Sequence, residues 1–170
     1  MLWSLFSACS NSERPEVDYS FEVAKDVVHD VEDFEQFEFT DGNDLDLGFY
    51  EGVAWIKLEI LNTGKPTSLV VLCGDLINQN YRFYELDELN HQLKPVEEGI
   101  DTDFNDHRTH HFAKPNFQID LGAGEKGTYY ISTSSDGRIL QGTPQLVSLN
   151  DFHAIKQGTL IFDIVFYGVI

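Results

Sequence analysis

An apolar segment in the first half of the chain carries two side-chain types that bind sugars. Residues 51–61 read EGVAWIKLEIL, with Trp55 two residues before Lys57. An indole face stacks on the C–H face of a sugar ring, while a neighbouring charged group hydrogen-bonds the hydroxyls. The side chains that extend this surface, if they share its face, are Tyr84, Arg82, Tyr129 and Tyr130. The alternative is that Trp55 packs beneath a loop, because strands are rich in aromatic residues for packing alone.

Three histidines lie close together in residues 106–111, which read DHRTHH. Imidazole is a common zinc ligand, but in a strand His107 and His111 share one face and His110 lies on the other. The spacing therefore fits a zinc site poorly. Solvent-exposed histidines that titrate at their ordinary pKa of about 6.5 are the alternative.

Residues 41–46, DGNDLD, offer carboxylates of the kind that bind calcium. Asp41, Asp44 and Asp46 lack the spacing and the final Glu of an EF-hand loop. We expect the chain to hold no cofactor, with calcium at these three aspartates as the alternative.

The sequence lacks the common catalytic motifs. It contains no Gly-x-Ser-x-Gly, no His-Glu-x-x-His and no phosphate-binding glycine loop. A glycoside hydrolase is the enzymatic alternative, and it requires two carboxylates that face each other across a cleft. We therefore expect a protein that is not an enzyme and has no catalytic residues.

The composition indicates one folded, acidic domain. A chain of 170 residues suits a single core, and 42% of its residues are hydrophobic. The formal net charge of -18 repels phosphate backbones, so nucleic acid is excluded as a partner.

Alternating hydrophobicity predicts strands through this domain. In residues 51–61, Ala54, Ile56, Leu58 and Ile60 face one side, and aromatic and charged residues face the other, which is partly wet. Further strands are expected at residues 69–73, 81–86, 117–121, 128–133 and 144–149. Short strands joined by Gly, Asp and Asn turns predict an all-β fold. We expect an antiparallel two-sheet sandwich with jelly-roll topology, with a barrel as the alternative.

The N-terminal segment has the pattern of an export leader. Residues 1–15, MLWSLFSACSNSERP, are apolar and then polar, as in a clipped signal peptide. Small residues before Cys9 also resemble a lipoprotein cleavage site, at which Cys9 is lipidated; otherwise Cys9 is lost with the leader. Either version exports the domain. Cys73, the other cysteine, lies in a predicted strand and is expected to be an inert core thiol.

The C-terminal segment is apolar. Residues 159–170, TLIFDIVFYGVI, carry a single charge at Asp163. A membrane-spanning helix needs about 20 apolar residues, so the segment fits the beginning of one. A final buried strand is the alternative, because short apolar runs fit both structures.

Several segments together resemble a known family, the type 2 extracellular domain of bacterial seven-transmembrane receptors with diverse intracellular signalling modules (DISM). The similar segments are GVAWIKLEILN at residues 52–62, residues 75–84, residues 108–121, FHA at residues 152–154 and LIFDIVFYGVI at residues 160–170. The resemblance favours the helix over the strand at the C-terminus.

The resemblance implies a jelly roll similar to carbohydrate-binding modules, on the periplasmic or extracellular side of a bacterial inner membrane. The chain then divides into a leader at residues 1–15, a sandwich at residues 16–154 and the start of a first transmembrane helix at residues 155–170. Such a domain senses a ligand, here a saccharide or another small polar molecule, and signals to a cytoplasmic module beyond residue 170. The candidate ligand-binding residues are Trp55, Lys57, Tyr84, Arg108, His110 and Asn116. A free or lipid-anchored carbohydrate-binding module is the alternative function.

Overall fold

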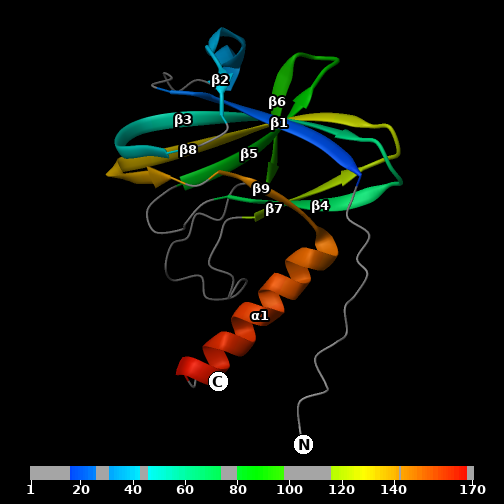
Figure 1. The fold of residues 1–170 in the computed structure, drawn as a ribbon. Helices are drawn as coiled ribbons and strands as arrows, with labels where there is room; N and C mark the ends of the chain where they lie inside the picture. The colour runs from blue at the N-terminus through cyan, green and yellow to red at the C-terminus, as the bar shows by residue number, and fades with distance from the viewer. Residues whose placement is uncertain are drawn as a thin grey trace, which may run out of the picture.

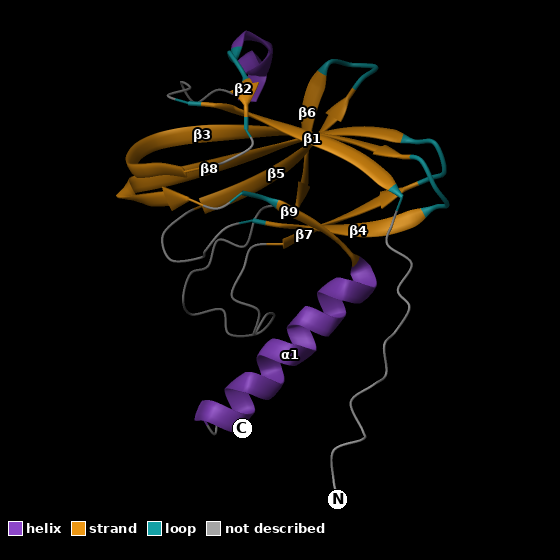
Figure 2. Cartoon of the chain, viewed as in Figure 1, coloured by secondary structure: helices purple, strands orange, loops and turns teal. Residues whose placement is uncertain are grey.

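A computed structural model describes residues 16–25, 31–42, 46–73, 80–97, 116–141 and 143–167. In these ranges the chain forms nine strands, one short 3-10 helix and one α-helix (Figures 1 and 2). The elements in chain order are β1 (Val17–Ala24), η1 (Val31–Gln36), β2 (Thr40–Asp41), β3 (Asp46–Asn62), β4 (Thr67–Leu72), β5 (Asn80–Asp87), β6 (Gln92–Glu97), β7 (Asn116–Leu121), β8 (Lys126–Gln141), β9 (Gln145–Ser148) and α1 (Leu149–Tyr167).

The strands form two antiparallel sheets that pack face to face (Figure 1). In the described part of the chain, one sheet has the order β2-β1-β3-β8-β5-β6 and the other the order β7-β4-β9. The chain crosses between the sheets at β3 to β4, β4 to β5, β6 to β7, β7 to β8 and β8 to β9. The predicted all-β, two-sheet sandwich is confirmed.

Strands β3 and β8 pair along most of their length and form the middle of the larger sheet. On β3, the predicted alternation holds: Ile56, Leu58 and Ile60 face the smaller sheet and are almost fully buried. Because successive strand residues point to opposite faces, Trp55 and Lys57 point away from the sandwich core. The larger sheet therefore has an inner apolar face and an outer face of mixed character.

Aromatic rings join the two sheets through the core. Phe83 on β5 stacks on Phe117 on β7, with ring centroids 4.6 Å apart and an angle of 9° between planes. The ring of Tyr129 on β8 also stacks on the ring of Phe83, with ring centroids 5.4 Å apart. Cys73 is buried in the same core, and burial raises the pKa of its thiol to about 12. The prediction of an inert core thiol is consistent with this position, because the reactive thiolate is suppressed.

One buried amide ties the ends of both sheets together. Asn62, at the end of β3, is 0% exposed. Its Nδ2 donates to the carbonyl oxygens of Lys65 and Gly122, both at 2.8 Å, and its Oδ1 accepts from the backbone N–H of Gly64 at 3.0 Å. The β3–β4 turn and the β7–β8 turn are thus held by a single side chain.

Helix α1 begins directly where strand β9 ends. Ser148, the last residue of β9, caps the helix: its Oγ accepts from the backbone N–H of Asp151 at 3.0 Å and donates to the carboxylate of Asp151 at 2.7 Å. Phe152 then packs against Val70 and Leu72 on the outer face of the smaller sheet. Beyond this contact the helix extends away from the sandwich (Figure 1).

The C-terminal segment is helical from residue 159 to residue 167, so the alternative of a final strand is wrong there. Among the helices of the described residues, none has both the length and the apolar character needed to cross a membrane.

Candidate functional site

Three aromatic side chains lie together on the outer face of the larger sheet. Trp55 on β3, Tyr130 on β8 and Tyr84 on β5 come from successive strands, and Tyr84 is directly opposite Tyr130. The ring centroids of Trp55 and Tyr84 are 5.6 Å apart, with 33° between planes. Arg82 is exposed on the same face, whereas Tyr129 points into the sandwich core. We call Trp55, Tyr84 and Tyr130 the aromatic cluster.

Residues 31–42, which we call the cover segment, lie on the outer side of the larger sheet (Figure 1), where they pack against the aromatic cluster. The segment contributes three phenylalanines, namely Phe34, Phe37 and Phe39. Phe34 meets the ring of Tyr130 edge-on at 5.4 Å, and Phe37 lies 5.4 Å from the indole of Trp55. Trp55 is only 2% exposed as a result. Trp55 is therefore shielded from solvent. It packs beneath a covering segment, as the alternative prediction for this residue stated.

The indole N–H of Trp55 has no hydrogen-bond partner among the described residues. A buried donor left unpaired costs about 1–3 kcal/mol, and few such atoms occur in folded proteins. The hydroxyl of Thr133 is a second such atom, but it lies on the inner face of β8. Trp55 thus offers a donor in the aromatic cluster that an oxygen atom of a ligand would satisfy.

A row of charges borders the aromatic cluster on the same face. Lys57 Nζ lies 3.2 Å from Glu59 Oε1 and 3.4 Å from Glu22 Oε2, and Lys126 Nζ lies 3.7 Å from Glu59. Partial burial opposes the charge on Lys57, but the hydrogen bonds and negative charges of Glu59 and Glu22 outweigh it and raise the pKa of Lys57. These groups donate and accept hydrogen bonds next to the rings, as recognition of hydroxyl groups requires.

Among the remaining predicted ligand-binding residues, the structure describes Asn116, which does not join this cluster. Asn116 begins β7 in the smaller sheet, opposite Leu72 on β4, and is therefore on a different sheet from Trp55. Arg108 and His110 lie outside the described residues, as do residues 1–15 with Cys9. Of the predicted residues, the structure brings together Trp55, Lys57 and Tyr84.

The predicted calcium ligands are spread between two strands. Asp41 is in β2, and Asp46 begins β3, where its Oδ1 accepts from the backbone N–H of Gly48 at 3.1 Å. Asp44 lies outside the described residues. No group of three or more His, Cys, Asp or Glu side chains within the described ranges is placed to hold a metal ion.

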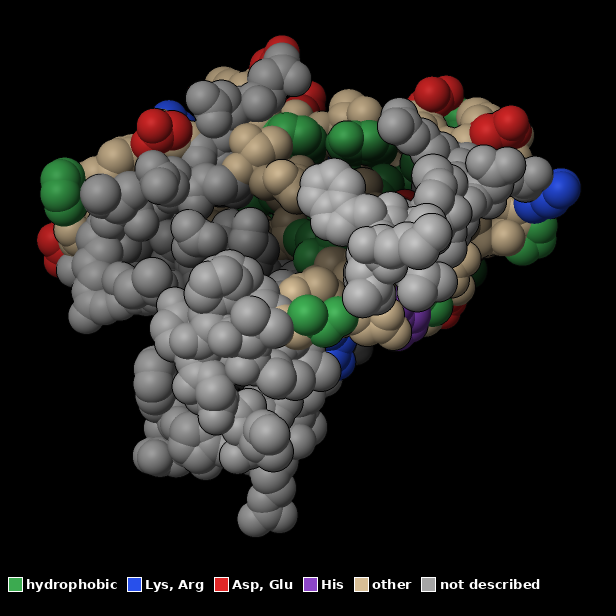
Figure 3. Space-filling view, turned by 60° about the horizontal axis from the view of Figure 1, so that its bottom comes forward, with side chains coloured by type: hydrophobic (Ala, Val, Ile, Leu, Met, Phe, Trp, Pro, Cys, Tyr) green, Lys and Arg blue, Asp and Glu red, His purple; other side chains and the backbone are tan. Residues whose placement is uncertain are grey.

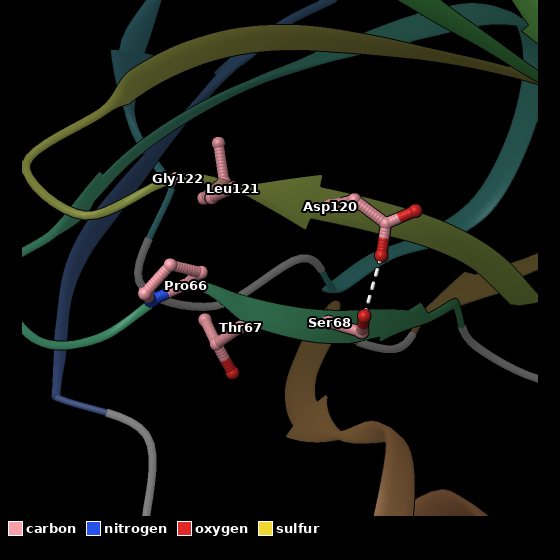
Figure 4. A pocket seen from close by; sticks show the side chains of 6 residues that line it. All are labelled: Pro66, Thr67, Ser68, Asp120, Leu121 and Gly122. Carbon is pink, nitrogen blue, oxygen red and sulfur yellow. Dashed lines mark hydrogen bonds between the residues drawn. The ribbon is translucent and has the colours of Figure 1, made fainter.

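A shallow hollow lies at one end of the smaller sheet. It has a volume of about 330 Å³ and is lined by Pro66, Thr67, Ser68, Asp120, Leu121 and Gly122 (Figure 4). The hydroxyl of Ser68 donates to Asp120 across β4 and β7, so the polar groups of the hollow satisfy each other. The hollow is open and contains no aromatic ring, and we assign no function to it.

Acidic side chains appear at several places along the edges of the face shown in Figure 3, with few Lys or Arg side chains among them. This distribution agrees with the net charge of -18. An acidic surface repels anionic ligands and favours neutral or cationic ones.

The sequence prediction did not include the cover segment. Its signal is visible in residues 31–39, VEDFEQFEF, where three phenylalanines recur among acidic residues. That spacing suits neither a strand nor a long helix. A mixed segment of this kind indicates that the phenylalanines pack on an apolar surface supplied by the rest of the fold.

Comparison with known proteins identifies a family. The family model described as 7TMR-DISM extracellular 2 matches residues 16–143. Neither the curated proteins nor the solved structures contain a match. The matched range begins just before β1 and extends past the end of β8, so it includes the aromatic cluster and the cover segment.

Proposed function

Because the chain belongs to the 7TMR-DISM extracellular 2 family, we propose that its sandwich is the ligand-binding part of a bacterial signalling receptor. Members of this family are extracellular sensor domains of membrane receptors. The observation that carries the proposal is the match over residues 16–143, because it covers the sandwich from β1 to β8 rather than one motif.

The ligand in this proposal is a saccharide or another small polar molecule. In this proposal the rings of the aromatic cluster, which residues 31–42 cover in this structure, contact the C–H side of the sugar, and Lys57 with Glu59 supplies hydrogen-bonding groups beside them. The acidic surface favours a ligand without negative charge. The domain binds this ligand without transforming it.

The output of the sensor passes through its C-terminal end. Helix α1 follows β9 without an intervening loop, and Phe152 fixes its first turns to Val70 and Leu72. A change in the smaller sheet is therefore transmitted to the helix axis. In this proposal the C-terminal segment leads into the membrane, the domain lies on the periplasmic or extracellular side, and a cytoplasmic signalling module follows.

A binding screen on the 170-residue chain tests the function. Glycan arrays and thermal-shift assays with sugars, amino acids, nucleosides and other small polar compounds are the measurements. A ligand at 100 times its Kd stabilises the folded state by about 2.7 kcal/mol, which appears as a clear, saturable rise in Tm. The ligand is expected to be recovered intact after incubation. The proposal fails if no compound of any class raises Tm, and cleavage of a bound sugar would contradict the non-catalytic role.

A further inference from the structure

The aromatic cluster has the composition of a binding surface, but its occupants belong to the chain itself. Phe37 lies against Trp55 with 46° between ring planes, and Phe39 lies 5.9 Å from Tyr130. Both phenylalanines are only partly buried, whereas Trp55 and Tyr130 beneath them are almost fully buried. Two phenylalanine rings of the cover segment therefore occupy the space over the cluster into which the C–H face of a ligand ring would have to fit.

The cover segment is held at its C-terminal end by a short strand pairing and by a backbone hydrogen bond from the N–H of Gly42 to the carbonyl oxygen of Phe21 at 3.2 Å. Strand β2 pairs with β1 at only two positions, Glu22 with Asp41 and Val23 with Thr40. Thr40 Oγ1 also donates to the carbonyl oxygen of Val23 at 3.1 Å. A two-residue strand at the edge of a sheet opens at low free-energy cost compared with the long β3–β8 pair.

A further contact between the cover segment and the sandwich is made by exposed groups. His91 Nδ1, in the turn between β5 and β6, lies 3.6 Å from Glu35 Oε1. Both side chains are more than half exposed, and exposed ion pairs contribute little to stability. The packing of its phenylalanines therefore contributes more to holding the cover segment than this exposed ion pair does.

We propose that the aromatic cluster is a covered binding site for a pyranose ring, and that the cover segment moves aside when the sugar binds. The sugar replaces Phe37 and Phe39 on the faces of Trp55 and Tyr130, and one of its oxygens accepts the unpaired indole N–H of Trp55. This inference rests on the proposed sensing function and adds to it the ring type of the ligand and the segment that moves. The apparent affinity is set by the open fraction, since only the open state binds.

The opposite view is that the cluster is a second, permanent core. In that case the cover segment never leaves, and sugars bind elsewhere or not at all. Variants that hold the cover segment closed or loosen it separate the two views.

A closed variant follows from the strand register. Asp41 is exposed and Glu22 is partly exposed; they lie directly opposite each other on β1 and β2, close enough for a disulfide between antiparallel strands. The double variant Glu22→Cys and Asp41→Cys is made in a Cys9→Ser background, while Cys73 stays buried. Because Glu22 also contacts Lys57, the same protein in its reduced form is the matched control.

A loosened variant follows from the close approach at Gly42. A Cβ atom there would lie 2.8 Å from Val23 Cγ2 and 2.9 Å from Phe21 Cδ2, closer than side-chain carbons approach each other. Gly42→Ala therefore pushes β2 away from β1. All proteins carry Trp3→Phe, so that Trp55 is the single tryptophan of the chain.

The first readout needs no ligand. Acrylamide quenching of Trp55 fluorescence measures how often the cover segment opens. We expect disulfide formation to reduce the quenching constant at least threefold relative to the reduced protein, and Gly42→Ala to raise it several-fold. Equal quenching in the oxidised and reduced proteins would overturn the inference, because a cover that does not open cannot admit a ligand.

The second readout is binding of three defined probes, cellohexaose, maltohexaose and chitohexaose, by calorimetry. At least one is expected to bind, with the disulfide weakening the affinity tenfold or more and Gly42→Ala strengthening it several-fold. Equal affinity of the oxidised and reduced proteins for a probe would show that the probe binds elsewhere. That result overturns this inference but leaves the sensing function intact. If none of the three probes binds the Gly42→Ala variant, the proposal of a pyranose ligand is wrong. The sensing function fails only if the wider screen finds no ligand of any class.

Discussion

Asn62 shows how one polar side chain can fix the end of a sandwich. Its side-chain amide forms hydrogen bonds with four backbone groups, the carbonyl oxygens of Lys65, Leu121 and Gly122 and the N–H of Gly64, and the residue is fully buried. Nothing in the local sequence NTGK distinguishes this asparagine from an ordinary turn residue. The role depends on residues 60 positions away, so sequence alone cannot reveal it.

Replacing Asn62 by Ala should lower the free energy of unfolding by about 3 kcal/mol, because buried carbonyl oxygens and an N–H lose their partner. Urea denaturation monitored by circular dichroism measures this. Asn90→Ala is the matched control: Asn90 Nδ2 donates to Asp87 at 2.8 Å on the surface, and its loss should cost less than about 1 kcal/mol. Equal effects of the two substitutions would contradict the role given to Asn62.

Buried thiol and phenol groups predict how the stability of the folded chain changes at high pH. Burial raises the pKa of Cys73 from 9.0 to about 12, and burial also raises the pKa of Tyr129 and Tyr130. Each group holds its proton longer in the folded chain than in the unfolded chain. The resulting stability is present below pH 9 and is lost as pH rises from 9 toward 12.

Urea unfolding at pH 8, 9, 10 and 11 tests this expectation in a Cys9→Ser background. The free energy of unfolding should fall across the series, with Cys73 contributing up to about 1.4 kcal/mol per pH unit above 9. Cys73→Ala, although less stable at every pH, should show a shallower fall. An identical slope in both proteins would show that Cys73 does not hold its proton in the core.

The elements differ in how far the sequence determines them. Strand β3 is predicted well because Ile56, Leu58 and Ile60 alternate with more polar residues on a sheet that has one core face. The sequence alone does not determine helix α1, because the apolar residues 159–170 suit both a strand and a helix. Its start is set by the Ser148 cap and by Phe152 docking, and the docking depends on Val70 and Leu72 of a distant strand.

The junction between β9 and α1 is expected to depend on Phe152. Phe152→Ala removes its contact with Val70 and Leu72 and should cost about 3 kcal/mol of docking energy. Hydrogen exchange at residues 149–158 should accelerate at least tenfold, while exchange in β3 and β8 stays unchanged. Ile161→Ala is the control because Ile161 is 61% exposed. Unchanged exchange in α1 of the Phe152 variant would mean that the helix is not held by the sheet.

At the scale of the whole molecule, the two outer faces of the sandwich have different roles. The cover segment and aromatic cluster lie on the larger sheet, and α1 is anchored on the smaller sheet at the opposite face (Figure 1). In the proposed sensor, the core between them, with Phe83 stacked on Phe117, would link the two faces. The sequence indicated the fold class and part of the cluster, namely Trp55, Lys57 and Tyr84. It did not reveal the cover, because the burial of Trp55 comes from a segment distant in sequence.

Hydrogen–deuterium exchange of the 170-residue chain, with and without the ligand found by screening, tests the sensing role most directly. A sensor must change at its output when it binds, whereas a simple binding module changes only at its site. We predict that ligand alters exchange both in residues 31–42 and at residues 149–158 of α1. Exchange changes confined to the binding face, with α1 unaffected at saturating ligand, would contradict the account.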